Sequence, residues 1–63
     1  MKKKELKKLA ERVFSYENVI EAGQPEDEEV KSAKDKIMKI MYSLSEEDAL
    51  ELDNEIMELT TNN

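Results

Sequence analysis

The side chains that could do chemistry in this chain are carboxylates, and the densest group of them is the run EDEE at residues 26–29. The chain has no histidine and no cysteine, so it lacks the usual ligands of zinc and the commonest general base. A calcium loop needs oxygen ligands at alternating positions and a glycine at its tight turn, and four consecutive acidic residues do not have that pattern. We therefore predict that the chain is not an enzyme and holds no metal or other cofactor.

Charge is distributed unevenly along the chain. The formal net charge is −6, yet residues 1–12 hold six basic and two acidic side chains and sum to +4, so the remaining residues sum to −10. An acidic body repels phosphate, and the basic stretch KKKELKKLAER at residues 2–12 has no aromatic residue for base stacking. We therefore expect neither direct nucleic-acid binding nor attachment to a membrane. A partner protein with a basic surface fits this charge.

Apolar residues recur at alternating spacings of three and four in three segments, which is the pattern of one face of an amphipathic helix. The middle segment has the most regular stripe, and we expect it to be the helix that the other two cover. The three stripes are Val30, Ala33, Ile37, Ile40 and Leu44; Leu6, Leu9, Val13, Tyr16 and Ile20; and Ala49, Leu52, Ile56 and Leu59.

Two connections separate the helices. Gly23 is expected to adopt the left-handed conformation that ends a helix, and Pro25 to occupy the first turn of the next one, followed by acidic residues that favour the helix dipole. Ser45 and Asp48 have the spacing of a capping box, which predicts a new helix there. The expected bounds are 3–22, 25–43 and 46–59, with a polar tail at 60–63.

The chain of 63 residues is expected to form a single small domain. Short connections favour antiparallel neighbours, so we predict an all-α fold, a three-helix up-down-up bundle. A helical hairpin that dimerises is the alternative, because so small a core is often supplemented by association. No segment is apolar enough to span a bilayer or to serve as a signal peptide, and we expect a cytoplasmic protein.

Two sets of residues are candidates for binding a partner. An up-down-up bundle would gather acidic residues at the end opposite the basic start, together with Glu55 and Glu58. Apolar residues beside the strict stripes are either additional core or an exposed contact surface. The acidic candidates are Glu17, Glu21, Glu26, Asp27, Glu28 and Glu29, and the apolar candidates are Phe14, Met38 and Tyr42.

These features predict a small, acidic, non-catalytic regulator that binds another protein as an adaptor or inhibitor. The alternative is a DNA mimic, whose acidic end blocks the basic groove of a nucleic-acid-handling protein. A homodimer remains an open alternative for the oligomeric state.

Overall fold

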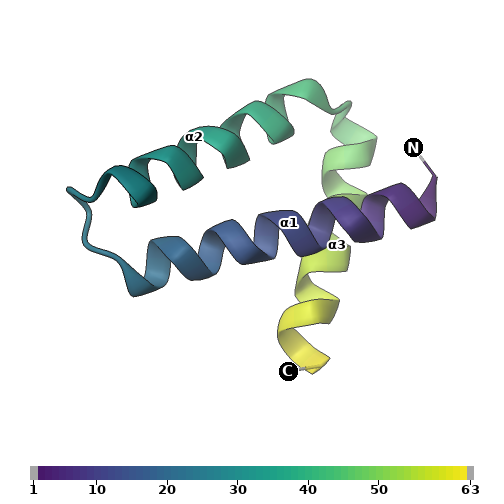
Figure 1. The fold of residues 1–63 in the computed structure, drawn as a ribbon. Coiled ribbons are helices and arrows are strands. Elements are labelled where there is room, and N and C mark those ends of the chain that lie inside the picture. The colour runs from purple at the N-terminus through teal and green to yellow at the C-terminus, as the bar shows by residue number, and fades with distance from the viewer. Residues whose placement is uncertain (1, 63) are drawn as a thin grey trace.

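The computed structural model describes residues 2–62 of the chain, and only the backbone of Asn62. Three helices form the fold: α1 (Lys3–Ala22), α2 (Glu28–Ser43) and α3 (Glu46–Asn62). Helices α1 and α2 run antiparallel as a hairpin, and α3 crosses α1 (Figure 1). Residues 2–62 contain no strand. The predicted all-α, three-helix fold is confirmed, and the first predicted helix has the expected bounds.

Gly23 ends α1 in an extended conformation, with φ −98° and ψ 172°, so the expected left-handed conformation is wrong. The glycine is required for another reason. A Cβ atom at this position would overlap Val30 Cγ2 and lie 3.2 Å from the carbonyl oxygen of Val19. Because Val30 is buried in the first turns of α2, the missing side chain lets α2 pack closely against the end of α1.

Helix α2 begins at Glu28 and not at Pro25, so the expected start of the second helix is wrong by three residues. The Asp27 N–H donates to the Gln24 carbonyl at 3.0 Å, and the Gln24 N–H donates to Asp27 Oδ2 at 3.1 Å. These two bonds close a turn around Pro25 and Glu26. The fixed φ of proline suits the second position of such a turn, and the helix starts only after it.

Ser45 caps the start of α3 as expected. Its Oγ accepts a hydrogen bond from the Asp48 N–H at 3.2 Å. The helix continues beyond its predicted end. Thr60 and Thr61 donate their hydroxyl protons to carbonyl oxygens one turn earlier, at 3.0 Å and 2.9 Å, and the backbone stays helical to Asn62. The expected polar tail at 60–63 is therefore wrong for residues 60–62, and Asn63 lies outside the described residues.

The hydrophobic core lies on α1, where Leu6, Ala10 and Val13 pack with Leu52 of α3. Helix α1 contacts both other helices, whereas α2 and α3 barely touch each other. The expectation that the middle segment is the central helix is therefore wrong, because the stripe of α1 is wide enough to serve two neighbours. Partly buried residues that pack against this core are Leu9, Ile37, Ile40, Met41, Leu44, Ile56 and Leu59.

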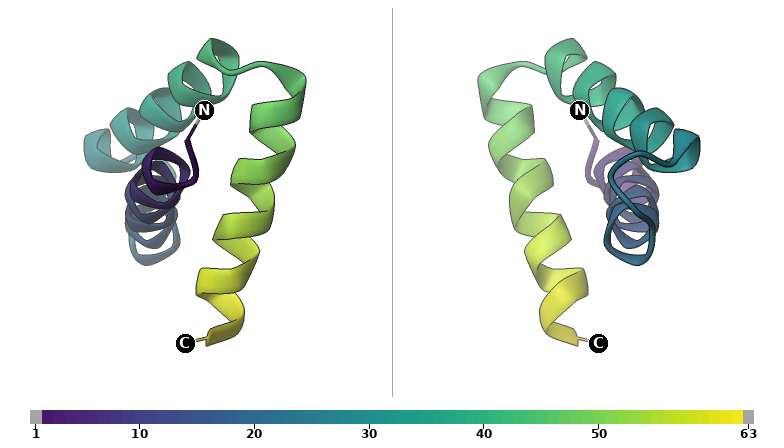
Figure 2. Two further views of the ribbon diagram at one scale, coloured as in Figure 1. Left: turned by 90° about the vertical axis from the view of Figure 1, so that its right-hand side faces the viewer. Right: turned by 90° about the vertical axis from the view of Figure 1, so that its left-hand side faces the viewer.

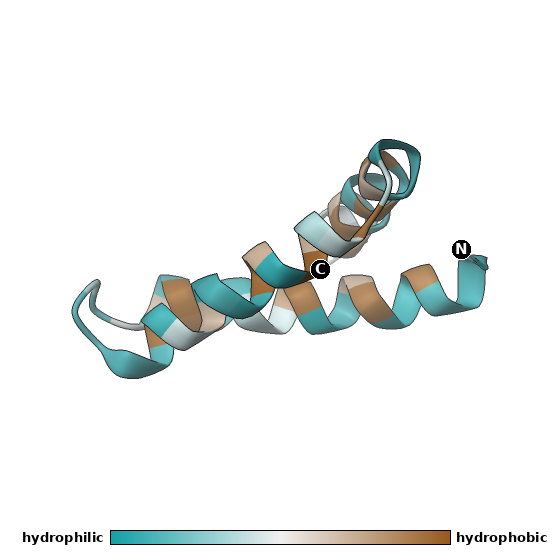
Figure 3. Ribbon diagram, turned by 90° about the horizontal axis from the view of Figure 1, so that it is seen from above, coloured by the Kyte–Doolittle hydropathy of each residue, from teal (hydrophilic) through white to brown (hydrophobic). Residues whose placement is uncertain are grey.

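The molecule is a flat body of 34 × 27 × 14 Å. The turned views show the α1–α2 hairpin on one side and α3 on the other (Figure 2). Hydrophobic positions recur along each helix between hydrophilic turns, while the α1–α2 connection is mostly hydrophilic (Figure 3). Helix α3 thus packs across α1 on one face of the hairpin, and we refer to the opposite face as the outer face.

Candidate protein-binding surfaces

The acidic candidates all lie at the end of the hairpin where α1 connects to α2, and all are exposed. We call this group the acidic end. None of its glutamates forms an ion pair with another described residue, and its aspartate accepts the turn hydrogen bond from Gln24. The ion pair that the described region does contain, Lys39 with Asp35 at 3.1 Å, lies farther along α2. The acidic end consists of Glu17, Glu21, Glu26, Asp27, Glu28 and Glu29.

The acidic end is divided between two sides of the hairpin. Glu17 and Glu21 line an open hollow of about 430 Å³ beside α3, together with Phe14 and Thr60. Glu28 and Glu29 line a different hollow between α1 and α2. The six candidates therefore share one end of the molecule but not one face.

Glu55 and Glu58 do not join the acidic end, contrary to expectation. They line a hollow beside Lys7 and Glu11, in the first half of α1. An up-down-up arrangement with α3 parallel to α1 would have carried them to the far end. Helix α3 crosses α1 (Figure 1), and these two carboxylates therefore lie beside the basic half of α1.

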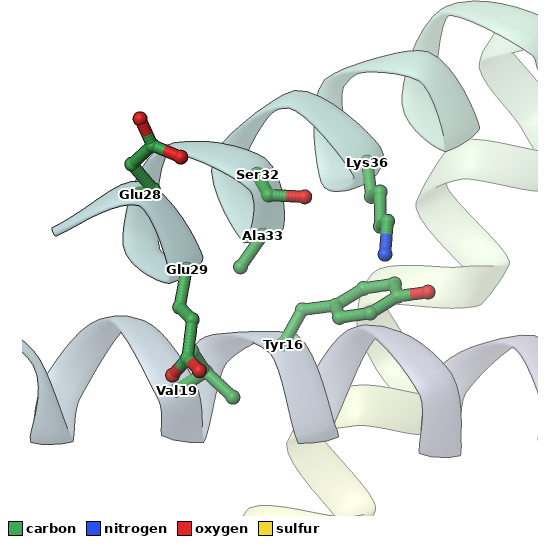
Figure 4. Close-up of a pocket in the computed structure, with 7 residues that line it drawn as sticks. All are labelled: Tyr16, Val19, Glu28, Glu29, Ser32, Ala33 and Lys36. Carbon is green, nitrogen blue, oxygen red and sulfur yellow. The ribbon is translucent and has the colours of Figure 1, made fainter.

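The outer face contains an open hollow of about 350 Å³ between α1 and α2 (Figure 4). Its apolar surface comes from Tyr16, Val19 and Ala33. The Lys36 ammonium lies over the Tyr16 ring, with Nζ 5.5 Å from the ring centroid, a distance at which a cation is attracted to the ring. The residues that line this hollow are Tyr16, Val19, Glu28, Glu29, Ser32, Ala33 and Lys36.

A second hollow, of about 290 Å³, continues along α1 and is lined by Glu5, Lys8, Leu9 and Arg12. Leu9, Arg12, Tyr16 and Val19 follow one another at spacings of three, four and three, which places them on one stripe of α1. Sequence reasoning missed this surface because Leu9 and Tyr16 fit the core stripe. The signal that could have revealed it is the arginine within that spacing.

The apolar candidates do not form one surface. Phe14 is half-buried in the hollow beside α3. Met38 and Tyr42 lie one turn apart on α2 and are 51% and 84% exposed, so they are not core residues. Leu50 and Met57, on the side of α3 away from the core, are 64% and 65% exposed.

Other kinds of site find no support within residues 2–62. That region holds no group of three or more side chains placed to bind a metal ion, and none of its polar or charged side chains is buried. No helix in the described part of the chain has the length and apolar character needed to cross a membrane.

No protein-family model, curated protein or solved structure matches this chain. The surfaces themselves therefore carry the functional inference.

Proposed function

We propose that this chain is a small non-catalytic regulator that binds a basic surface of another protein through its acidic end. The observation that carries the proposal is a set of exposed carboxylates at one end of the hairpin, of which no glutamate forms an ion pair with another residue in the described range 2–62. Residues 13–29 hold six acidic and no basic side chains. Such a concentration of one charge steers a partner of opposite charge and speeds its association.

Phe14 supplies an apolar contact within this acidic surface. It is half-buried and lines the hollow whose rim includes Glu17 and Glu21. Binding surfaces commonly combine a central aromatic contact with a polar rim, because the aromatic side chain contributes affinity while the rim contributes specificity. A basic partner with one apolar side chain among its cations fits this arrangement.

The same carboxylates support DNA mimicry as a second candidate. In that case the partner's basic surface is the groove in which it holds nucleic acid, and the chain acts by occupying that groove. The two candidates differ in one outcome, since duplex DNA would compete with the chain for a mimic's partner and not for another partner. The expectation of a cytoplasmic site of action rests on the sequence alone.

To test this proposal, the wild-type chain and two charge-matched variants are each immobilised, and the proteins that each captures from a lysate of the source cells are compared. Glu17→Lys with Glu21→Lys changes the acidic end on the side away from the outer face. Glu51→Lys with Asp53→Lys makes the same change of charge at exposed positions of α3. Lysines in the last turns of α1 also complement the helix dipole, so the first variant should fold.

We expect the wild-type chain and the α3 variant to capture the same protein, and the acidic-end variant to lose it. Capture should weaken as salt is raised, because the contact is between exposed charges. The captured protein's activity is then measured with and without the chain, and with duplex DNA as competitor. Equal capture by both variants would contradict the proposal.

A further inference from the structure

We propose that the outer face of the hairpin binds the same face of a second copy, which forms a two-fold symmetric homodimer. This inference does not depend on the proposed function, because it concerns the purified chain alone. It also leaves Glu17, Glu21 and Phe14 accessible beside α3.

The accessible surface of the chain is larger than that expected for a compact monomer of the same mass. Its accessible surface is 5002 Å², whereas a compact monomer of 7.3 kDa is expected to expose roughly 4,200 Å². The excess, about 800 Å², is close to what one partner contributes to a standard protein–protein interface. The radius of gyration, 11.9 Å, likewise exceeds the roughly 10.6 Å expected for a compact domain of this length.

Apolar side chains on the outer face supply the contact. Leu9, Tyr16 and Val19 are half-buried along one stripe of α1, and Ala33 of α2 lies in the hollow beside them. The hairpin groove is open here because α3 lies on the other face (Figures 2 and 4). Two hairpins that meet by these grooves bring four helices together, which is the packing of a helical bundle.

The two ends of the outer face carry opposite net charge, because Lys8 and Arg12 outnumber Glu5 at one end and Glu28 and Glu29 lie at the other, so a two-fold rotation that exchanges the ends is favourable there. Lys8 lies eight residues before Tyr16, and Glu28 lies eight residues before Lys36. Because α1 and α2 are antiparallel and Lys36 lies over Tyr16, these charges stand on opposite sides of the Tyr16–Lys36 pair, each about 12 Å along a helix from it.

Consider a two-fold axis that lies in the plane of the interface and runs across the hairpin at the Tyr16–Lys36 pair. This axis reverses the direction of the helices in the second copy. It places the Lys8 and Arg12 end of each copy over the Glu28 and Glu29 end of the other. The favourable contact is made twice, as an isologous interface requires. A second copy is therefore an occupant whose charges match both ends of the face.

The sharpest test exchanges the charges at the two ends. Lys8→Glu with Arg12→Glu makes both ends of the outer face acidic, and Glu28→Lys with Glu29→Lys makes both ends basic. All four side chains are exposed, and circular dichroism checks that each variant keeps its helices. Light scattering on eluting protein, from micromolar to millimolar concentration, gives the mass.

We expect the wild-type chain to approach twice its 7.3 kDa as concentration rises. Each charge variant alone should remain a monomer, with at least a tenfold weaker association. An equimolar mixture of the two should form a heterodimer, because unlike charges then meet at both ends. A wild-type chain that stays monomeric, or variants that dimerise as well as the wild type, would overturn the proposal.

Cross-linking tests the same interface independently, in case the variant Glu28→Lys with Glu29→Lys loses helix. The chain has no cysteine, so a single introduced thiol reports on one position. Lys36→Cys lies near the axis, and a short bis-maleimide should join two copies through it. Met57→Cys, on the far side of α3, serves as the control. Cross-linking through residue 57 and not through residue 36 would place the interface on α3 and overturn the proposal.

Discussion

The outer face of the hairpin and the outer side of α3 both expose apolar side chains, and they differ in what surrounds those side chains. On the outer face of the hairpin, Leu9, Tyr16 and Val19 are half-buried. Lys8 and Arg12 lie beside Glu5 toward one end of this face, and acidic residues lie toward the other. On the outer side of α3, Leu50 and Met57 are more exposed. The charged residues around those two are acidic, and α3 carries no basic side chain at all.

The degree of exposure does not by itself make a surface suited to self-association. Two copies that met by the outer side of α3 would bring acidic residues together, and like charges oppose association. The hairpin's outer face is less exposed but has charges of both signs, separated along its length. The arrangement of charge around an apolar stripe distinguishes the two surfaces better than the area of the stripe does.

The largest effect is expected on the free energy of unfolding, when leucines on the inner and outer sides of α3 are compared. Leu52 is fully buried against α1, whereas Leu50 is exposed. Leu52→Ala should lower the free energy of unfolding by on the order of 3 kcal/mol, because it leaves a cavity in the core. That is a large part of the roughly 3 to 9 kcal/mol expected for a domain of this length. Leu50→Ala is the matched control and should cost less than about 0.5 kcal/mol in urea denaturation. Equal losses would contradict this placement of α3.

The next effect concerns the turn that holds the hairpin together. Gly23→Ala should lower the free energy of unfolding by about 1 to 3 kcal/mol, because the new Cβ overlaps Val30 Cγ2. The control is the same substitution in a Val30→Ala background, where the overlapping methyl group is absent and the added cost should fall below about 1 kcal/mol. A cost that is unchanged in that background would rule out this contact as the reason for the glycine.

A smaller effect is expected at the start of α3, the helix that leaves the outer face of the hairpin uncovered. Ser45→Ala removes the side chain that accepts the Asp48 N–H and should cost about 1 kcal/mol. Ser43→Ala is the control, since the Ser43 hydroxyl only donates to a carbonyl within α2. Thermal unfolding of the two variants compares them, and the cap would be unimportant if both melted at the wild-type temperature.

The smallest effect is expected on the outer side of α3. Met57→Ser should change the free energy of unfolding by less than about 0.5 kcal/mol, because the side chain is 65% exposed. It should also leave the concentration dependence of the mass unchanged in light scattering. A clear loss of association in this variant would move the binding surface from the hairpin to α3.

Much of the local structure could be predicted from the sequence. The stripe that includes Leu6 and Val13 fixed which side of α1 is buried, and the spacing of Ser45 and Asp48 located the start of α3. Such features depend on residues within one or two turns of each other. The bounds of α1, Lys3–Ala22, were correct for the same reason.

The arrangement of the helices could not be predicted in the same way. A stripe such as that of Val30 and Ala33 says which side of a helix is buried and not which helix covers it, so the central role of α1 was missed. The crossing of α3 places Glu55 and Glu58 beside Lys7, far from the acidic end. The need for glycine at position 23 depends on Val30, a contact between two helices that the local sequence does not specify.

The most direct test of the claim that the outer face of the hairpin is a binding surface is a dilution series of ¹⁵N–¹H correlation spectra of the wild-type chain. We expect the amide signals that move with concentration to belong to residues around Leu9, Tyr16 and Lys36, while those around Asp53 and Met57 stay fixed. Shifts confined to the outer side of α3, or spectra that do not change with concentration, would contradict the claim.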